Sequence, residues 1–356
     1  MRYFPALGPA VSVDLVYQTW RPTDYGYYPR HDLNPLFGAQ WHSIWSSELV
    51  ISGYYAAHWN QLGGRIIFSF SSPLISDPHS HSGARLEILV DGGGLITGGK
   101  IYKSDGSILE YSQAASGSGF LLTSITDPNG HALLFSYDGY GRLEEITDAA
   151  GGVTTFVYGN LDGDLDEANN RVATQVNAPG GYTASFAYEQ RADGRWYLTN
   201  IVDAADIPTS FTYREDETIM DSVSYPYWPL ATMTTPYGTT QFEYLGDLVP
   251  LYNGWTALRM TDFGTTLLIT EPNGGKHLYL QADHAVSSVP IPSTFNPSVI
   301  PSGLPVGTLD TNRVAGNTYY WGPLQLAGIG NVDIESWDWD EFKRARIRHW
   351  LWHHDE

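Results

Sequence analysis

The middle of the chain carries a repeat, and this repeat limits the folds that the sequence can adopt. The pair Phe-x-Tyr occurs five times, and a short turn-like segment precedes each pair. Phe and Tyr two positions apart project from the same face of a β-strand, so each pair is expected to contribute two rings to a repeating core. The pairs are Phe135/Tyr137, Phe156/Tyr158, Phe186/Tyr188, Phe211/Tyr213 and Phe242/Tyr244.

The segments between the strands have the composition of tight turns. Asp127-Pro-Asn-Gly130 and Asp148-Ala-Ala-Gly151 place Asp first and Gly fourth. An Asp at the first position of a type I turn accepts hydrogen bonds from backbone N–H groups further along the turn, and Gly suits the fourth position. Each unit is therefore predicted to be a β-hairpin. One hairpin is marginally stable in water, whereas stacked hairpins bury a common apolar face.

Residues 125–158 also resemble a known family. They contain Tyr137-Asp138, Gly141-Arg142-Leu143 and Ile146-Thr147-Asp148 in that order, which is similar to the YD repeat of the Rhs family. A further Gly-Arg pair stands at Gly194-Arg195. The strong resemblance covers residues 125–213.

The resemblance implies a fold and a role. Rhs and related YD-repeat proteins wind stacked hairpins into a hollow shell, and many of them are secreted or cell-surface carriers of a C-terminal toxin. The fold prediction is all-β, with stacked antiparallel β-hairpins in a curved sheet that forms an arc of an Rhs-type shell, plus a short C-terminal helix. About five to seven hairpins would make this chain the N-terminal part of a non-enzymatic encapsulating scaffold. Its expected partners are the rest of a longer Rhs polypeptide or a protein cargo, and its expected location is secreted or cell-surface.

Composition divides the chain into four regions. Residues 1–100 are predicted to be an N-terminal β lead-in, and residues 101–285 the hairpin array. Residues 286–310 are Pro-rich and are predicted to be a linker. Residues 311–356 are predicted to hold a strand and a C-terminal helix over 337–353, where acidic residues precede basic ones as the helix dipole favours.

The net charge excludes one class of partner. Lys plus Arg number 19 and Asp plus Glu 39, which gives −20 at pH 7 and argues against nucleic acid, whose phosphates require clustered basic residues. No apolar run reaches the roughly 18 residues of a membrane span, so none is predicted. The chain has no cysteine, which excludes disulfides and thiolate metal sites.

Calcium is the one cofactor that the sequence suggests. Asp162, Asp164 and Asp166 place carboxylates at alternate positions, and Ca²⁺ binds several such oxygens. Leu165 stands where an EF-hand needs Gly, so a solvated acidic insertion is the favoured alternative. His79 and His81 could bind a metal together with Asp77, although a loop pair without function is favoured there.

No catalytic residues are identified, and the chain is predicted not to be an enzyme. The alternative function is that of a carbohydrate-binding β module, in which exposed aromatic rings stack on sugars. A glycoside hydrolase is a third alternative, but it needs a defined pair of carboxylates that the sequence does not single out. Buried rings would favour the scaffold, and rings lining an open groove would favour glycan binding. The candidate stacking residues are Trp41, Trp45, Trp59, Trp228 and Trp255.

Overall fold

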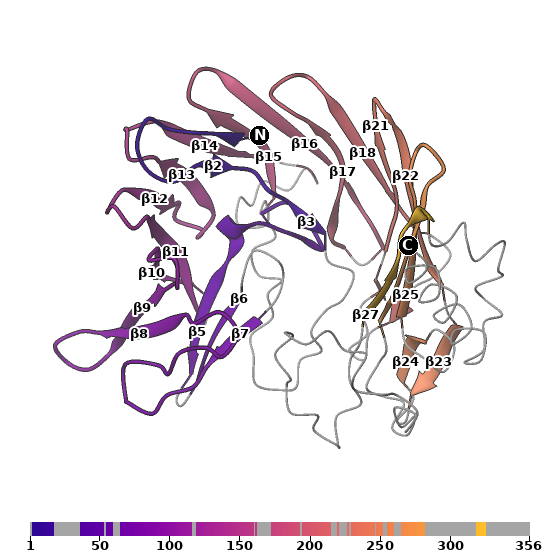
Figure 1. Cartoon of the computed structure of the whole chain (residues 1–356). Helices are drawn as coiled ribbons and strands as arrows, with labels where there is room; N and C mark the ends of the chain where they lie inside the picture. Colours follow the sequence, from indigo (N-terminus) through magenta and orange to yellow (C-terminus); the bar gives the residue numbers. More distant parts are fainter. Residues whose placement is uncertain are drawn as a thin grey trace, which may run out of the picture. The chain divides into compact units, whose positions relative to one another are not determined.

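The structure is a computed structural model of the whole chain (Figure 1). It describes residues 2–17, 36–52, 55–59, 65–115, 119–159, 161, 172–192, 194–214, 219–220, 226–227, 229–245, 247–251, 255–259, 265–281 and 318–324. Contacts divide the chain into two compact units, Met1–Ser210 and Phe211–Glu356. The predicted Pro-rich linker and C-terminal helix lie outside the described residues.

The regular secondary structure of the described residues is almost entirely β-strand, which confirms the all-β prediction. The first unit begins with two short ribbons, in which β1 (Arg2–Tyr3) pairs with β2 (Val11–Ser12) and β3 (Val16–Tyr17) pairs with β4 (Trp41–His42). A single 3-10 turn follows, η2 (Ile44–Ser46), capped by Ser43.

The main sheet of the first unit is antiparallel and mostly follows chain order. The array runs through β8 (Arg85–Val90), β9 (Ile96–Tyr102), β10 (Ile108–Ala114), β11 (Gly119–Thr126), β12 (Ala132–Tyr137), β13 (Leu143–Thr147), β14 (Val153–Tyr158), β15 (Ala173–Ala178), β16 (Tyr182–Gln190), β17 (Trp196–Val202) and β18 (Pro208–Tyr213). This order is the stacked-hairpin arrangement that the repeat predicts (Figure 1).

A three-stranded branch joins the array at β11. It consists of β5 (Glu48–Ser52), β6 (Tyr55–Trp59) and β7 (Arg65–Phe68). Gly119–Leu121 of β11 pair with β5, while Ser124–Thr126 pair with β12. Because β10 pairs along the opposite edge of β11, the sheet forks at this strand.

The buried face of the array holds the repeated aromatic and aliphatic side chains. Phe135 faces Ile146, Phe156 faces Val176 and Phe186 faces Ile201 across neighbouring strands. The three phenylalanines are 6–7% exposed, and Ile146 and Val176 are fully buried. The aliphatic residue that precedes a Phe-x-Tyr pair therefore faces the phenylalanine of the preceding unit. Such aromatic–aliphatic cross-strand pairs stabilise sheets.

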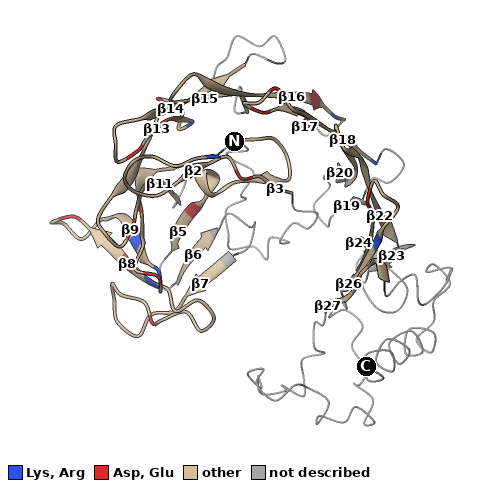
Figure 2. Ribbon diagram, turned by 45° about the horizontal axis from the view of Figure 1, so that its top comes forward, with Lys and Arg blue, Asp and Glu red and all other residues tan. Residues whose placement is uncertain are grey.

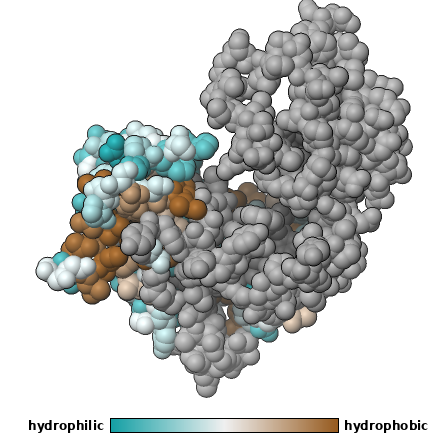
Figure 3. Space-filling model, turned by 90° about the horizontal axis from the view of Figure 1, so that it is seen from below, coloured by the Kyte–Doolittle hydropathy of each residue, from teal (hydrophilic) through white to brown (hydrophobic). Residues whose placement is uncertain are grey.

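The free edge of β8 is covered by the connection from β7. The Ser76 N–H donates to the Leu86 carbonyl at 2.8 Å, and the Ile88 N–H donates to the Leu74 carbonyl at 2.7 Å. Covering an edge in this way prevents pairing with foreign strands. Leu74 and Ile75 stay 41% and 49% exposed, and Figure 3 shows apolar surface on the described part of the chain, seen from below.

The second unit holds a smaller antiparallel sheet and two short ribbons. The sheet has the order β21 (Leu230–Thr235), β22 (Gly238–Leu245), β25 (Thr265–Thr270), β26 (Lys276–Gln281) and β27 (Thr318–Trp321). The ribbons are β19 (Ile219–Met220) with β20 (Pro226–Tyr227), and β23 (Asp247–Leu251) with β24 (Trp255–Arg259).

Candidate functional site

Five hairpin turns of the first unit share one arrangement around an aspartate. In each, one carboxylate oxygen accepts the backbone N–H groups two and four residues further on, at 2.8–3.0 Å. The turns therefore close on a charged acceptor, which strengthens these hydrogen bonds. The aspartates are Asp91, Asp127, Asp138, Asp148 and Asp203. The predicted use of Asp127 and Asp148 as turn residues is thus confirmed, and Asp203 has the same role.

The Tyr-Asp-x-x-Gly-Arg motif is explained by one such turn. The second carboxylate oxygen of Asp138 accepts the side-chain Nε–H of Arg142 at 2.6 Å. The Arg142 guanidinium lies over the ring of Tyr158 at 4.6 Å and over that of Tyr140 at 5.1 Å. Arg142 is 8% exposed, so this buried charge is both paired and stacked. The motif links one hairpin to the tyrosine of the next.

Four β-bulges stand in register along the described part of the array. At each bulge a tyrosine faces a residue of the following strand, and the next residue of that strand has no partner opposite it. The facing pairs are Tyr111/Leu122, Tyr137/Leu143, Tyr158/Ala173 and Tyr188/Leu198. Bulges bend a strand and increase its twist, so a regular series of them curves the sheet in one sense.

Threonine occupies the unpaired position at three of these bulges. Its hydroxyl donates to the carbonyl of the residue before the tyrosine, at 3.1–3.2 Å. The three donors are Thr123, Thr174 and Thr199. At the fourth bulge the position is held by Glu144, which is exposed. The hydroxyl satisfies a carbonyl that the bulge removes from the regular ladder.

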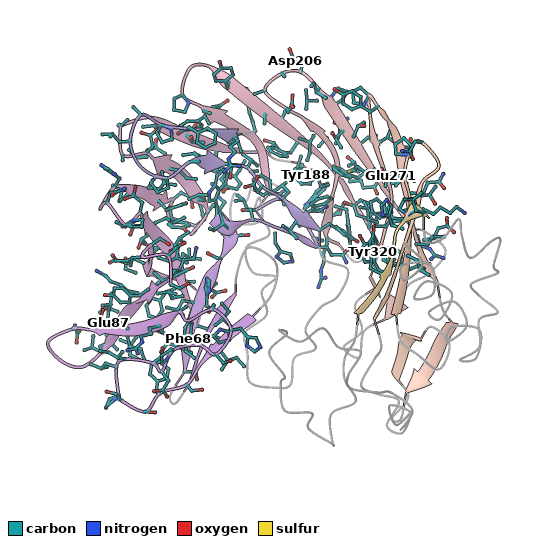
Figure 4. All side chains as sticks on the ribbon, in the orientation of Figure 1. Phe68, Glu87, Tyr188, Asp206, Glu271 and Tyr320 are labelled. Atoms are coloured by element: carbon teal, nitrogen blue, oxygen red, sulfur yellow. The ribbon has the colours of Figure 1, made fainter. Side chains whose placement is uncertain are left out.

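The tyrosine hydroxyls connect successive bulges. Tyr137 donates to the Leu122 carbonyl at 2.6 Å, Tyr158 to the Leu143 carbonyl at 2.8 Å and Tyr188 to the Ala173 carbonyl at 2.6 Å. Each acceptor is the residue that faces the tyrosine of the preceding bulge. Burial raises the pKa of Tyr137 and Tyr158, so both phenols stay protonated donors. We call this series the tyrosine ladder; Tyr188 is labelled in Figure 4.

A segment near the N-terminus covers the buried face of the array. The Phe37 ring packs on Phe186 at 5.0 Å, and the Trp45 ring meets Phe156 edge-on at 5.5 Å. The Ala39 N–H donates a backbone hydrogen bond of 2.8 Å to the Trp196 carbonyl. We call residues 36–47 the lining segment; Figure 2 shows the N-terminal strands on the concave side of β11–β17. The lining segment closes the core that the hairpins alone would leave open.

The lining segment ends at a buried polar cluster. The Tyr111 hydroxyl lies 3.0 Å from the Ser47 hydroxyl and 2.7 Å from Nε2 of His58. All three residues are at most 5% exposed, which leaves no access for a substrate. The adjacent Glu48 is also largely buried, and desolvation raises the pKa of its carboxyl to about 7.

A polar cluster of the second unit ties β27 to the sheet. Nδ1 of His277 lies 2.8 Å from the Tyr320 hydroxyl, and Nε2 lies 3.1 Å from a Glu271 carboxylate oxygen. The Tyr320 ring also packs on Tyr279 at 4.8 Å. Figure 4 labels Glu271 and Tyr320. The cluster joins a turn, β26 and a strand that comes much later in the chain.

The residues that the sequence singles out as repeat core, glycan-stacking or calcium-binding candidates differ in their burial. Tyr213 and Tyr244 are 3% and 7% exposed, and Phe211 is 6% exposed, so these repeat residues lie in the core. Trp41 and Trp45 are 8% and 3% exposed, so neither offers a ring face to a sugar. Trp59 and Trp255 lie in strands whose side chains at these positions are not described, so glycan stacking there stays a prediction. Trp228 and the predicted calcium ligands Asp162, Asp164 and Asp166 lie outside the described residues.

The described part of the chain contains neither a cluster of metal-binding side chains nor a helix that could span a membrane. Among these residues, no three His, Asp or Glu side chains gather closely enough to hold an ion. The His79 and His81 rings are 5.7 Å apart, and each lies within hydrogen-bond distance of a neighbouring serine hydroxyl. No helix among the described residues has the length and apolar character of a membrane span.

The turns, bulges and tyrosine ladder described above are the features of a scaffold built from stacked β-hairpins. Residues 117–161 match the RHS repeat family model, so the chain contains an RHS repeat, as its Tyr-Asp and Gly-Arg residues predict. The matched residues include the Asp138–Arg142 turn and its stacking partner Tyr158. A search of curated proteins finds no match.

Several solved structures align weakly with the chain. A TcdB2–TccC3–Cdc42 crystal structure shares 12% identity over 70% of this chain and 17% of its own, with a TM-score of 0.29. The N-terminal domain of the effector protein SpvB from Salmonella typhimurium shares 14% over 78% and 90%, with a TM-score of 0.26. A porin-like protein from Bacteroides uniformis shares 12% over 69% and 93%, with a TM-score of 0.20. Such TM-scores do not establish a common fold.

Proposed function

We propose that the chain is a non-enzymatic wall segment of a larger secreted or cell-surface Rhs-type protein that encloses a protein cargo. The RHS repeat and the hairpin array support the scaffold part of this proposal. The tyrosine ladder is the main observation in favour of the scaffold proposal, because the same contact recurs from hairpin to hairpin. A contact that repeats in this way allows a regular sheet to be extended by further hairpins.

The side chains of the repeat motif support a structural role over catalysis. Asp138 closes its own turn, Arg142 is paired and stacked, and Tyr158 donates to a backbone carbonyl. Catalytic groups need a reacting atom within hydrogen-bond reach. These contacts join the three residues to one another, to the Tyr140 ring and to the backbone.

The cargo proposal can be tested on the complete polypeptide that contains this chain. Limited proteolysis followed by mass spectrometry would compare residues beyond Glu356 in the intact protein with the same residues expressed alone. Enclosure predicts at least a tenfold slower cleavage in the intact protein. A variant with Tyr137→Phe, Tyr158→Phe and Tyr188→Phe would weaken the wall and restore cleavage. Equal cleavage rates, or a reading frame that ends at Glu356, would leave the scaffold without an enclosed C-terminal cargo.

A further inference from the structure

The fork at β11 is held by a short ladder. β5 joins the array through three residue pairs, Gly119 with Val50, Phe120 with Leu49 and Leu121 with Glu48. The lining segment runs directly into β5, because Ser47 precedes Glu48. The attachment of the branch and the end of the lining segment therefore depend on the same few residues. Short ladders open locally at a lower free energy than long ones.

The Glu48 side chain lies inside this junction. Its carboxylate covers Gly119, where a Cβ atom would clash with Oε1, so the carboxyl fills the space that Gly119 leaves. A buried carboxylate without a nearby cation is strongly unfavourable, whereas the protonated acid is tolerated.

The groups around Glu48 do not include a cation in contact with it among the described side chains. β11 and η2 carry no ionisable residue. His58 of β6 and Tyr111 of β10 hydrogen-bond each other on the face opposite Glu48, since strand residues alternate between faces. Glu110 of β10 pairs with Lys100 of β9 at 3.3 Å. On β6, Tyr55 faces Ser52 of β5. On β7, Arg65 faces Trp59 of β6, which in turn faces Glu48, so the backbone of Arg65 is two strands away from Glu48.

We propose that Glu48 is a pH-sensitive latch on the fork: with its proton the β5–β11 ladder stays closed, and without it the ladder opens and frees the end of the lining segment. The inference is independent of any enclosed cargo. Burial alone raises the pKa of Glu48 to about 7, so the latch would operate near neutrality. The ordinary pKa of a glutamate, about 4.3–4.5, applies to the opened form, where water solvates the carboxylate.

The direction and size of the effect follow from linkage. The closed form binds the Glu48 proton more tightly than the open form, so closure weakens as pH rises from about 4.5 and levels off above about 7. With these two pKa values, the equilibrium constant for opening rises roughly 25-fold between pH 5.5 and pH 8.0. The change would be confined to residues 36–52 and 119–126.

Hydrogen–deuterium exchange on the full chain, corrected for the intrinsic pH dependence of exchange, measures this opening. The wild type should lose protection in β5 and the first half of β11 between pH 5.5 and 8.0, while β16–β17 keep theirs. Glu48→Gln, which keeps the shape and cannot ionise, should hold the junction closed at both pH values. Glu144→Gln, at an exposed glutamate of β13, should behave as wild type.

Three results would overturn the latch. Equal protection of the wild-type junction at both pH values would show that Glu48 stays stably buried in either state. Persistence of the same pH dependence in Glu48→Gln would assign it to another group. The variant Arg65→Gln tests whether Arg65 neutralises Glu48. In that case the wild-type junction would show no change of protection with pH, and the variant would acquire one. This result would also contradict the proposal.

Discussion

The Tyr158 hydroxyl donates a 2.8 Å hydrogen bond to the backbone carbonyl of Leu143, the residue that faces Tyr137 across a β-bulge. One repeat tyrosine thus marks the bulge, and the hydroxyl of the next donates to the carbonyl of the residue opposite it. The same relation joins Tyr188 to Ala173, which faces Tyr158. The register of each hairpin is therefore tied to that of its predecessor.

Tyr158→Phe removes this hydrogen bond while keeping the ring. The buried Leu143 carbonyl then loses its partner, which should cost about 1–2 kcal/mol of local stability. Hydrogen exchange of the β13 and β14 amides measures the local opening free energy. Tyr182→Phe is the matched control, because that ring is 57% exposed, and it should change stability by less than about 0.5 kcal/mol. Equal effects of the two substitutions would contradict the ladder.

The local parts of this arrangement could be predicted from the sequence. Asp127 and Asp148 bond to N–H groups within four positions, so the turn composition is sufficient evidence. The bulges depend on the register between strands, which alternation alone does not specify. A signal existed nonetheless, since Thr123, Thr174 and Thr199 each lie fourteen residues before a repeat tyrosine.

The lining segment and the Glu48 junction could not be found in this way. Phe37 and Trp45 belong to no repeat, and their contacts with Phe186 and Phe156 arise from tertiary packing. The depth of Glu48 likewise depends on Gly119, a residue far away in the sequence. Sequence patterns report local structure and faces, and they carry little information about which distant segment covers a face.

Phe37→Ala should show that the lining segment is part of the core of the first unit. Phe37 is fully buried against Phe186, and truncating such a ring costs about 3–5 kcal/mol. Urea unfolding monitored by hydrogen exchange in β16 and β17 measures the loss. Phe4→Ala, at a ring that is 74% exposed, serves as the control and should have little effect. Unchanged protection in β16 and β17 would mean that the array is stable without its lining.

Glu144→Thr should stabilise the one bulge that lacks a threonine. At the other three, the hydroxyl donates to the carbonyl of the residue before the tyrosine. The same rotamer at position 144 would reach the Ser136 carbonyl, with an expected gain of about 0.5–1 kcal/mol. Thermal unfolding would measure it, with Glu144→Val as the control, because valine has the same branched shape and no hydroxyl. If both variants gain equally, the β-branched shape and not the hydrogen bond is responsible.

The Asp138 turn should weaken in acid. Burial raises the pKa of Asp138, but the hydrogen bonds from Arg142 and Tyr140 outweigh it and hold the pKa below its usual value. The stability from this carboxylate is therefore complete above the unfolded pKa of about 3.9 and is lost as pH falls through the lower folded value. Exchange in β12–β13 between pH 5 and pH 2.5 should show this loss. Asp138→Asn should flatten the dependence, because the amide oxygen still accepts N–H groups but does not titrate.

Asp206→Gly should stabilise the β17–β18 turn. Asp206 lies at the tip of this turn with a φ of 59°, where Gly130, Gly141 and Gly151 occupy the same position in other turns (Figure 4). A left-handed conformation costs a non-glycine residue about 1 kcal/mol, and glycine adopts it freely. The variant should gain up to about 1 kcal/mol in the local stability of the β17–β18 hairpin, measured by amide exchange. Ala205→Gly, one position earlier, is the matched control and should destabilise the turn. Glycine adds backbone freedom to the unfolded chain, and position 205 has no left-handed strain for it to relieve. A loss of stability in Asp206→Gly would mean that the aspartate side chain makes a contact worth more than the strain it carries.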